Sequence, residues 1–181
     1  RSLDVTWKAQ EDFTRGENAL VVADGSGSMY DGSHPLPAAV AQSLAVYFAE
    51  RNRGPFRNRF ITFSEHPRLV EIKGRDIAEK IQYTMSFNEV ANTDLQGVFD
   101  LLLREAVRKR MTQEELPQRL YVISDMEFDA ACCRGERTNF QRAREKFRAQ
   151  GYELPQVIFW NVDSRTRQQP VTQNQQGAVL V

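Results

Sequence analysis

ALVVADGSGS, residues 19–28, is the stretch that decides the fold of this chain. Its first five residues are all apolar, and a short apolar run without polar alternation is typical of a strand that is covered on both faces, as in a parallel sheet. The run ends at Asp24 and passes into a loop of glycine and serine. We therefore predict a buried strand at 19–23, with the polar loop at its carboxyl end.

Strands and helices are expected to alternate along the rest of the chain. After the loop, Val40, Leu44, Tyr47 and Phe48 share one face of a predicted helix. Further strands are predicted at 59–64, 68–72, 120–123, 157–162 and 178–181, and further helices at 74–83, 95–106 and from 138 or 139 to 151. Only residues 65–67 separate the second strand from the third, so these two strands must be antiparallel. The pattern predicts an α/β fold, a doubly wound, mostly parallel six-stranded sheet with one antiparallel edge strand and helices on both faces.

Length and composition fit one domain, which we take to be residues 1–181. The chain has 41% hydrophobic residues and a formal net charge of zero, which argues against disorder and against a surface field that would attract nucleic acid. Cys132 and Cys133 have no other thiol to pair with, which indicates a reducing, cytoplasmic setting, and the sequence does not show whether they have a role. No apolar run reaches the roughly 18 residues of a membrane span, so no membrane contact is expected. Because the chain lacks an initial Met and stops in an apolar run, we expect it to be a piece of a longer protein.

Oxygen-bearing side chains from three segments are expected at one edge of the sheet. Asp24, Ser26 and Ser28 follow the first strand, Asp125 follows a later strand, and Thr93 opens a helix. Ligands of open α/β sheets bind beyond the carboxyl ends of the strands. Hydroxyl and carboxylate oxygens suit hard cations, Mg²⁺ first and Mn²⁺ or Ca²⁺ as alternatives. Two carboxylates leave residual positive charge on such an ion, so an Asp or Glu of a protein partner could replace a water on it.

The same residues carry a resemblance to a known family. The order Asp24-Gly25-Ser26-Gly27-Ser28, then Thr93, then Asp125 resembles the metal-ion-dependent adhesion site of von Willebrand factor A (vWA) domains, which have a Rossmann-like fold. The resemblance implies that Ser26 and Ser28 bind the metal directly. It implies that Asp24 and Asp125 bind it directly or through water, and that Thr93 alternates between the two modes.

Three further stretches are similar to a branch of that family. Residues 122–129 and 157–162 resemble the C-terminal half of TROVE/Ro-type proteins, and together with 172–177 they resemble the DUF2828 branch. The resemblance implies a metal-dependent binding module within a Ro-like ribonucleoprotein, with RNA bound only by a helical-repeat portion that this chain lacks. Met126 stands where a Gly is common in vWA domains, and Glu127 and Asp129 add acid that would tighten the metal or repel an acidic ligand. Neither the partner nor the oligomeric state follows from the sequence.

The alternatives to a binding module are an enzyme and a structural domain. An Asp directly after the first strand also occurs in phosphatases that form an aspartyl-phosphate, but these have a second Asp where Ser26 stands. A serine nucleophile at an elbow needs glycines two residues to either side, whereas those around Ser26 are one residue away. A dinucleotide loop needs a third glycine where Tyr30 stands. We therefore expect no catalysis, and keep as alternatives a metal-dependent phosphohydrolase and a structural domain whose arginine faces contact RNA.

The remaining conspicuous side chains have simpler interpretations. His34 and His66 lie in loops beside prolines and are expected at the surface. Trp160 lies late in an apolar strand and is expected in the core. Met29 and Met126 flank the proposed site, either as an apolar collar or as packing residues.

Overall fold

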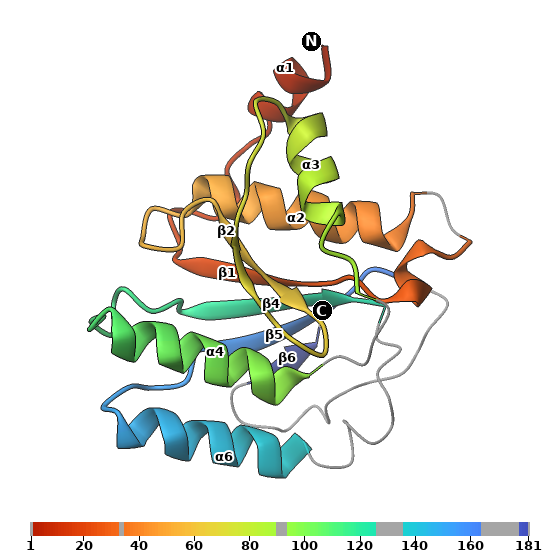
Figure 1. Cartoon of the computed structure of the whole chain (residues 1–181). Helices are drawn as coiled ribbons and strands as arrows, with labels where there is room; N and C mark the ends of the chain where they lie inside the picture. Colours follow the sequence, from red (N-terminus) through yellow and green to blue (C-terminus); the bar gives the residue numbers. More distant parts are fainter. Residues whose placement is uncertain (1, 33–34, 90–93, 126–135, 164–177, 181) are drawn as a thin grey trace.

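The computed structural model of the chain describes residues 2–32, 35–89, 94–125, 136–163 and 178–180, and shows one sheet between two layers of helices (Figure 1). The strands are β1 (Ala19–Asp24), β2 (Arg59–Phe63), β3 (Leu69–Glu71), β4 (Arg119–Ser124), β5 (Gln156–Asn161) and β6 (Ala178–Leu180). The helices are α1 (Ser2–Lys8), the 3-10 helix η1 (Gly27–Tyr30), α2 (Pro37–Arg51), α3 (Ile77–Met85), α4 (Leu95–Arg108) and α6 (Glu136–Ala149).

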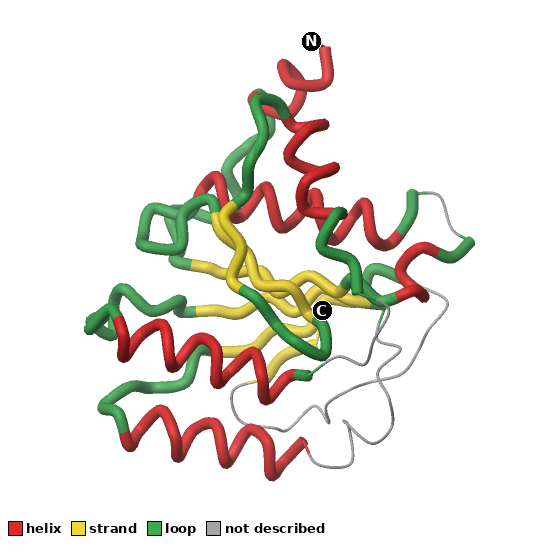
Figure 2. Tube along the Cα trace, viewed as in Figure 1, coloured by secondary structure: helices red, strands yellow, loops and turns green. Residues whose placement is uncertain are grey.

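The sheet has six strands in the order β3-β2-β1-β4-β5-β6. β2 and β3 pair antiparallel, and the other neighbouring pairs are parallel. Figure 2 shows α2 and α3 over one face of the sheet and α4 and α6 over the other. This is the predicted doubly wound α/β arrangement, with the antiparallel strand at one edge.

Strand β1 lies at the centre and is buried along its whole length. Leu20 and Val22 belong to the hydrophobic cluster beneath α4 and α6, whereas Val21 and Ala23 belong to the cluster beneath α2. Successive side chains of a strand point to opposite faces, and both faces are covered here. The absence of polar alternation in this stretch therefore follows from its central position.

Helix α2 packs on the sheet through its small side chains. Ala38, Ala41 and Ala45 are fully buried, which lets the helix backbone approach the sheet closely. The predicted apolar face of this helix is only partly buried, although Leu44 and Phe48 still pack against the cluster beneath α2. Periodicity found the helix correctly, but the larger apolar residues do not mark its most buried face.

The N-terminal segment, for which no element was predicted, lies against α2. Trp7 donates a hydrogen bond from Nε1 to Glu50 Oε2 at 2.8 Å, and its ring contacts that of Tyr47 edge-on. The Tyr47 hydroxyl donates to the carbonyl of Glu11 and accepts from the backbone N–H of Phe13, both at 2.8 Å. No residue of α1 is buried, and its apolar residues Leu3, Val5 and Trp7 alternate with polar ones, a spacing that does not indicate a helix.

Helix α3 begins with an ion pair that holds its first turn. Arg75 donates from its guanidinium to Glu79 Oε1 at 2.6 Å and from its backbone N–H to Glu79 Oε2 at 2.9 Å. The hydrogen bonds from Arg75 lower the pKa of Glu79 from 4.5 to about 2. Because the folded-state pKa is lowered, the pair stabilises the fold above about pH 4.5, and this contribution is lost as the pH falls through about 2.

In a carboxyl-detected NMR titration, Glu79 is therefore expected to titrate with a midpoint near pH 2. Arg75→Gln should return that midpoint toward the ordinary value, because the main hydrogen-bond donor is gone. Arg57→Gln removes an exposed arginine elsewhere and serves as the control, with no change at Glu79. An ordinary midpoint in the unmodified protein would contradict the pairing.

Candidate metal centre

Four of the five predicted metal ligands lie among the described residues, all at the carboxyl ends of β1 and β4. Asp24 is the last residue of β1, and Asp125 directly follows β4. Ser26 lies in the loop after β1, and Ser28 lies within η1. Thr93 lies outside the described residues, so its placement stays a prediction.

The register between the two central strands brings the carboxylate of Asp24 against β4. Ala23 pairs with Ile123, which places Asp24 level with Ser124. The hydroxyl of Ser124 donates to Asp24 Oδ2 at 2.5 Å, and the backbone N–H of Ser26 donates to Asp24 Oδ1 at 2.8 Å. Both carboxylate oxygens of Asp24 are therefore fixed in place.

Two acidic side chains are buried together at this point. Asp24 and Asp125 are each 1% exposed. Burial raises the pKa of Asp24 most strongly and the nearby Asp125 adds to the increase, whereas hydrogen bonds from Ser124 and Ser26 oppose it. Buried like charges are unfavourable unless a cation or a proton compensates them. A divalent cation beside these two groups would offset that repulsion.

The spacing of the two serine hydroxyls suits one small cation. Ser26 Oγ and Ser28 Oγ lie 3.2 Å apart. Neighbouring ligands of an octahedral Mg²⁺, each at about 2.0–2.1 Å, are separated by about 3 Å. Both side chains are partly exposed, so they can contact an ion that is also open to solvent. The donor set therefore fits a hard divalent cation with an accessible coordination position.

The chain between α3 and α4 approaches Gly25 closely. A Cβ atom at this position would lie 3.2 Å from the Cα of Asn88 and 3.7 Å from the backbone nitrogen of Glu89. Real Cβ atoms rarely have such close neighbours. The backbone of residues 88–89 thus packs directly on the loop after β1.

The start of α4 is tied to the same edge of the sheet. The backbone N–H of Asp94 donates to the carbonyl of Ser64, directly after β2, at 3.1 Å. Asp94 Oδ1 accepts from the backbone N–H of Gly97 at 2.9 Å and so caps the helix. These bonds fix the start of α4 at the edge of the sheet where the candidate ligands lie. Asp94, which makes them, directly follows Thr93 in the sequence.

Several buried oxygens at this edge have no hydrogen-bond partner within the described part of the chain. They are Ser64 Oγ, Glu89 Oε2 and Gln96 Oε1. A buried oxygen without a donor is unfavourable, and water or a cation commonly compensates it.

Ser124 was not identified from the sequence, and Met29 was predicted only as a collar or packing residue beside the site. Ser124 is fully buried and donates to Asp24, and Met29 accepts the backbone N–H of Asp125 through Sδ at 3.2 Å. The first contact joins β1 to β4, and the second joins η1 to the residue after β4, so both become visible only in the folded structure. The position of Ser124 directly before Asp125 is the one signal in the sequence that could have suggested its role.

The structure describes only some of the other side chains for which a prediction was made from the sequence. His66 is exposed as predicted, and Trp160 is partly buried beside Tyr121. His34, Cys132–Cys133 and 126–129 lie outside the described residues. Within the described ranges, no group of three or more His, Cys, Asp or Glu side chains is arranged to hold a metal, so the candidate centre depends on its serine hydroxyls. None of the described helices has the length and apolar character needed to cross a membrane.

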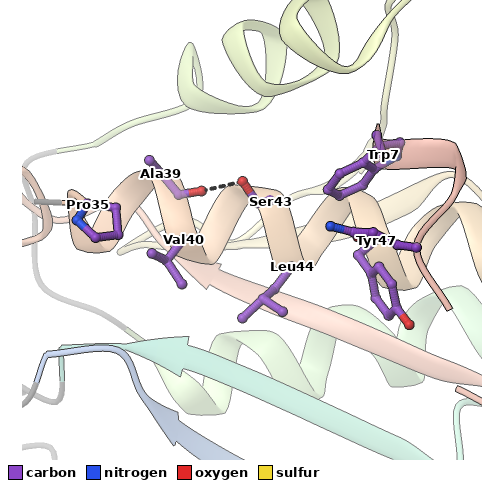
Figure 3. Close-up of a pocket in the computed structure, with 8 residues that line it drawn as sticks. Trp7, Pro35, Ala39, Val40, Ser43, Leu44 and Tyr47 are labelled. Atoms are coloured by element: carbon purple, nitrogen blue, oxygen red, sulfur yellow. Dashed lines mark hydrogen bonds between the residues drawn. The ribbon is translucent and has the colours of Figure 1, made fainter. Parts of the chain in front are cut away.

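An apolar pocket of about 300 Å³ lies on α2, apart from the candidate ligands. Its lining is Trp7, Gln10, Pro35, Ala39, Val40, Ser43, Leu44 and Tyr47. Figure 3 shows the side chains of Val40 and Leu44 on one side of α2, with Trp7 over the far end of the helix. This pocket accounts for the partly buried apolar face of α2.

Comparison with solved structures supports the fold. The chain is similar to the crystal structure of the SpRpn10 VWA domain, with a TM-score of 0.50 and 15% sequence identity over 91% of this chain and 86% of that one. At this identity the likeness concerns the fold alone. The chain thus has a vWA-like fold, as predicted, while the resemblance to TROVE/Ro-type and DUF2828 proteins stays a prediction.

Comparison by sequence identifies the family. The chain is 31% identical over 179 residues to "Uncharacterized protein L728" of Acanthamoeba polyphaga mimivirus, covering 98% of this chain. It spans only 31% of the length of that viral protein. Residues 18–181 match the model described as "Domain of unknown function (DUF7788)". The chain therefore belongs to the DUF7788 family.

Proposed function

We propose that this domain is a divalent-metal-dependent binding module. Asp24, Ser26, Ser28, Thr93 and Asp125 would hold the ion, with Mg²⁺ favoured over Mn²⁺ and Ca²⁺. The ion would then accept an Asp or Glu side chain of a protein partner in its open position. The observation that carries this proposal is the buried pair Asp24 and Asp125, beside two serine hydroxyls that lie 3.2 Å apart.

The charges of the site support binding of an acidic group. The two carboxylates balance a divalent ion only formally, because hydrogen bonds already withdraw electron density from both oxygens of Asp24. The remaining ligands are neutral hydroxyls, so the ion keeps an attraction for a further anion. Such a bond is strengthened where the surroundings exclude water.

Binding is favoured over catalysis by the residue at position 26. A phosphohydrolase that forms an aspartyl-phosphate would have a second carboxylate there, and this chain has a serine. The vWA-like fold is likewise compatible with an interaction module. We further infer a cytoplasmic setting, because Cys132 and Cys133 have no other thiol to pair with. We also infer a place within a Ro-like assembly, from the resemblance of residues 122–129 and 157–162 to TROVE/Ro-type proteins.

Isothermal titration calorimetry with MgCl₂ and MnCl₂ tests the metal site. We expect saturable binding at one site and, at a free metal concentration of 100 times Kd, a gain of about 2.7 kcal/mol in unfolding free energy. Asp24→Asn and Asp125→Asn should each weaken binding at least about tenfold, since each removes a charge from the coordination sphere. Glu153→Gln, which removes a carboxylate that is 74% exposed in the loop before β5, should leave the affinity unchanged.

The outcomes separate the candidate functions. Absence of saturable binding, or equal binding by Asp24→Asn, would overturn the metal module. If metal binds, an immobilised peptide with a single Glu should retain the protein only in the presence of Mg²⁺, and its Gln counterpart should not. Turnover of an aryl phosphate that disappears in Asp24→Asn would instead establish the phosphohydrolase.

A further inference from the structure

Two contacts join the loop after β1 to the end of β4. One is the hydrogen bond from Ser124 to Asp24, and the other is the contact between Met29 Sδ and the backbone N–H of Asp125, at 3.2 Å. A thioether sulfur is a weak acceptor, and buried backbone N–H groups usually find an oxygen instead. A sulfur acceptor for the buried backbone N–H of Asp125 is therefore unusual and needs a physical explanation.

Met29 is attached to the candidate ligands at both of its ends. Its backbone N–H donates to the carbonyl of Ser26 at 3.1 Å, and its side chain reaches the main chain of Asp125. Met29 is 0% exposed and Asp125 is 1% exposed, so water has little access to replace the contact. One residue thus connects the serine loop to the second carboxylate.

We propose that Met29 is a positioning residue of the metal centre. Its sulfur holds the backbone of Asp125, so that the Asp125 carboxylate stays beside Asp24 and in reach of an ion held by the serine loop. This inference rests on the proposed metal-binding function and adds to it a residue that touches no ion itself. Packing alone does not require a sulfur here, because leucine has nearly the same volume and would fill the cluster beneath α2 equally well.

Hydrogen exchange of the Asp125 amide, measured by NMR without metal, tests the contact itself. We expect slow exchange in the unmodified protein and exchange about five to ten times faster in Met29→Leu, because the net contribution of one hydrogen bond is lost. Met111→Leu is the matched control, since it removes a buried thioether from the cluster beneath α4 and α6. Fast exchange at Asp125 in the unmodified protein, or equal exchange in Met29→Leu, would overturn the inference.

Calorimetric titration with MgCl₂ tests the consequence for the site. Met29→Leu should weaken Mg²⁺ binding by about five- to tenfold, whereas Met111→Leu should bind as the unmodified protein does. Urea unfolding of both metal-free variants identifies any general loss of stability, which a purely structural role of Met29 would produce without a change in affinity. Mg²⁺ binding that is equal in Met29→Leu and the unmodified protein would overturn this inference alone, whereas absence of binding by the unmodified protein would overturn the metal module itself.

Discussion

Replacing Phe99 by alanine is expected to lower the free energy of unfolding by about 3–5 kcal/mol. Phe99 lies on α4 and is 0% exposed. Its ring centroid is 5.6 Å from that of Phe140 on α6, and the Phe140 ring in turn meets Phe159 of β5 edge-on. Removal of the first ring leaves a cavity that three packed elements cannot easily close, and both the lost burial and the cavity reduce stability.

Urea unfolding followed by circular dichroism measures this effect. Phe13→Ala removes the same side chain at a position that is 73% exposed, and should change the free energy of unfolding by less than about 0.5 kcal/mol. Equal losses for the two variants would contradict the assignment of Phe99 to the core. The comparison matters for the site, because Phe99 anchors the helix whose start is tied to the end of β2.

Asn52→Ala is expected to lower the free energy of unfolding by about 3 kcal/mol, because it leaves buried backbone groups unpaired. Asn52 is 1% exposed at the end of α2. Its Nδ2 donates to the carbonyl of Ala19 at 2.9 Å and to Asn18 Oδ1 at 3.0 Å, and its Oδ1 accepts the backbone N–H of Gly54 at 2.6 Å. This side chain therefore connects the end of α2 to the beginning of β1.

A double-mutant cycle with Asn18→Ala separates the network from the single residues. Asn18 Nδ2 reaches the carbonyls of residues 114–116 in the loop before β4. Since the two amides are bonded to each other, the double variant should lose less stability than the sum of the single losses. The free energies come from urea unfolding, with Gln82→Ala, an exposed residue of α3, as the control. Strict additivity would show that the two amides act independently.

Much of the fold was predictable because local patterns reflect the environment of each strand. The uniform apolar character of β1 indicated a strand covered on both faces, and the short connection after β2 could lead only to an antiparallel edge. The close packing of the alanines of α2 was not predictable in this way. Which side of a helix lies nearest to a sheet depends on the distance between the layers, and spacing along the sequence does not contain that distance.

The positions of the two candidate carboxylate ligands were predictable because they follow from the parallel direction of the strands. Asp24 and Asp125 each come at the end of an apolar run, and parallel strands end at the same edge of the sheet. The hydrogen bond of Ser124 depends instead on the register of β1 and β4, which no feature within either stretch determines. The contact of Met29 depends on how η1 packs against the end of β4, which the local sequence does not determine either.

In the proposed metal centre, the central pairing of β1 with β4 would make a bound ion report the order in which parts of the chain associate. Ser124 and Asp24 are 100 residues apart, whereas β1 with β2 and β4 with β5 join segments much closer along the chain. Closing a long loop is entropically more demanding than closing a short one, so each half can organise before the two meet. Neither half alone contains both carboxylates. During synthesis, or after cleavage between the part with β1 and the part with β4, the chain would therefore bind the cation only once these two parts have associated.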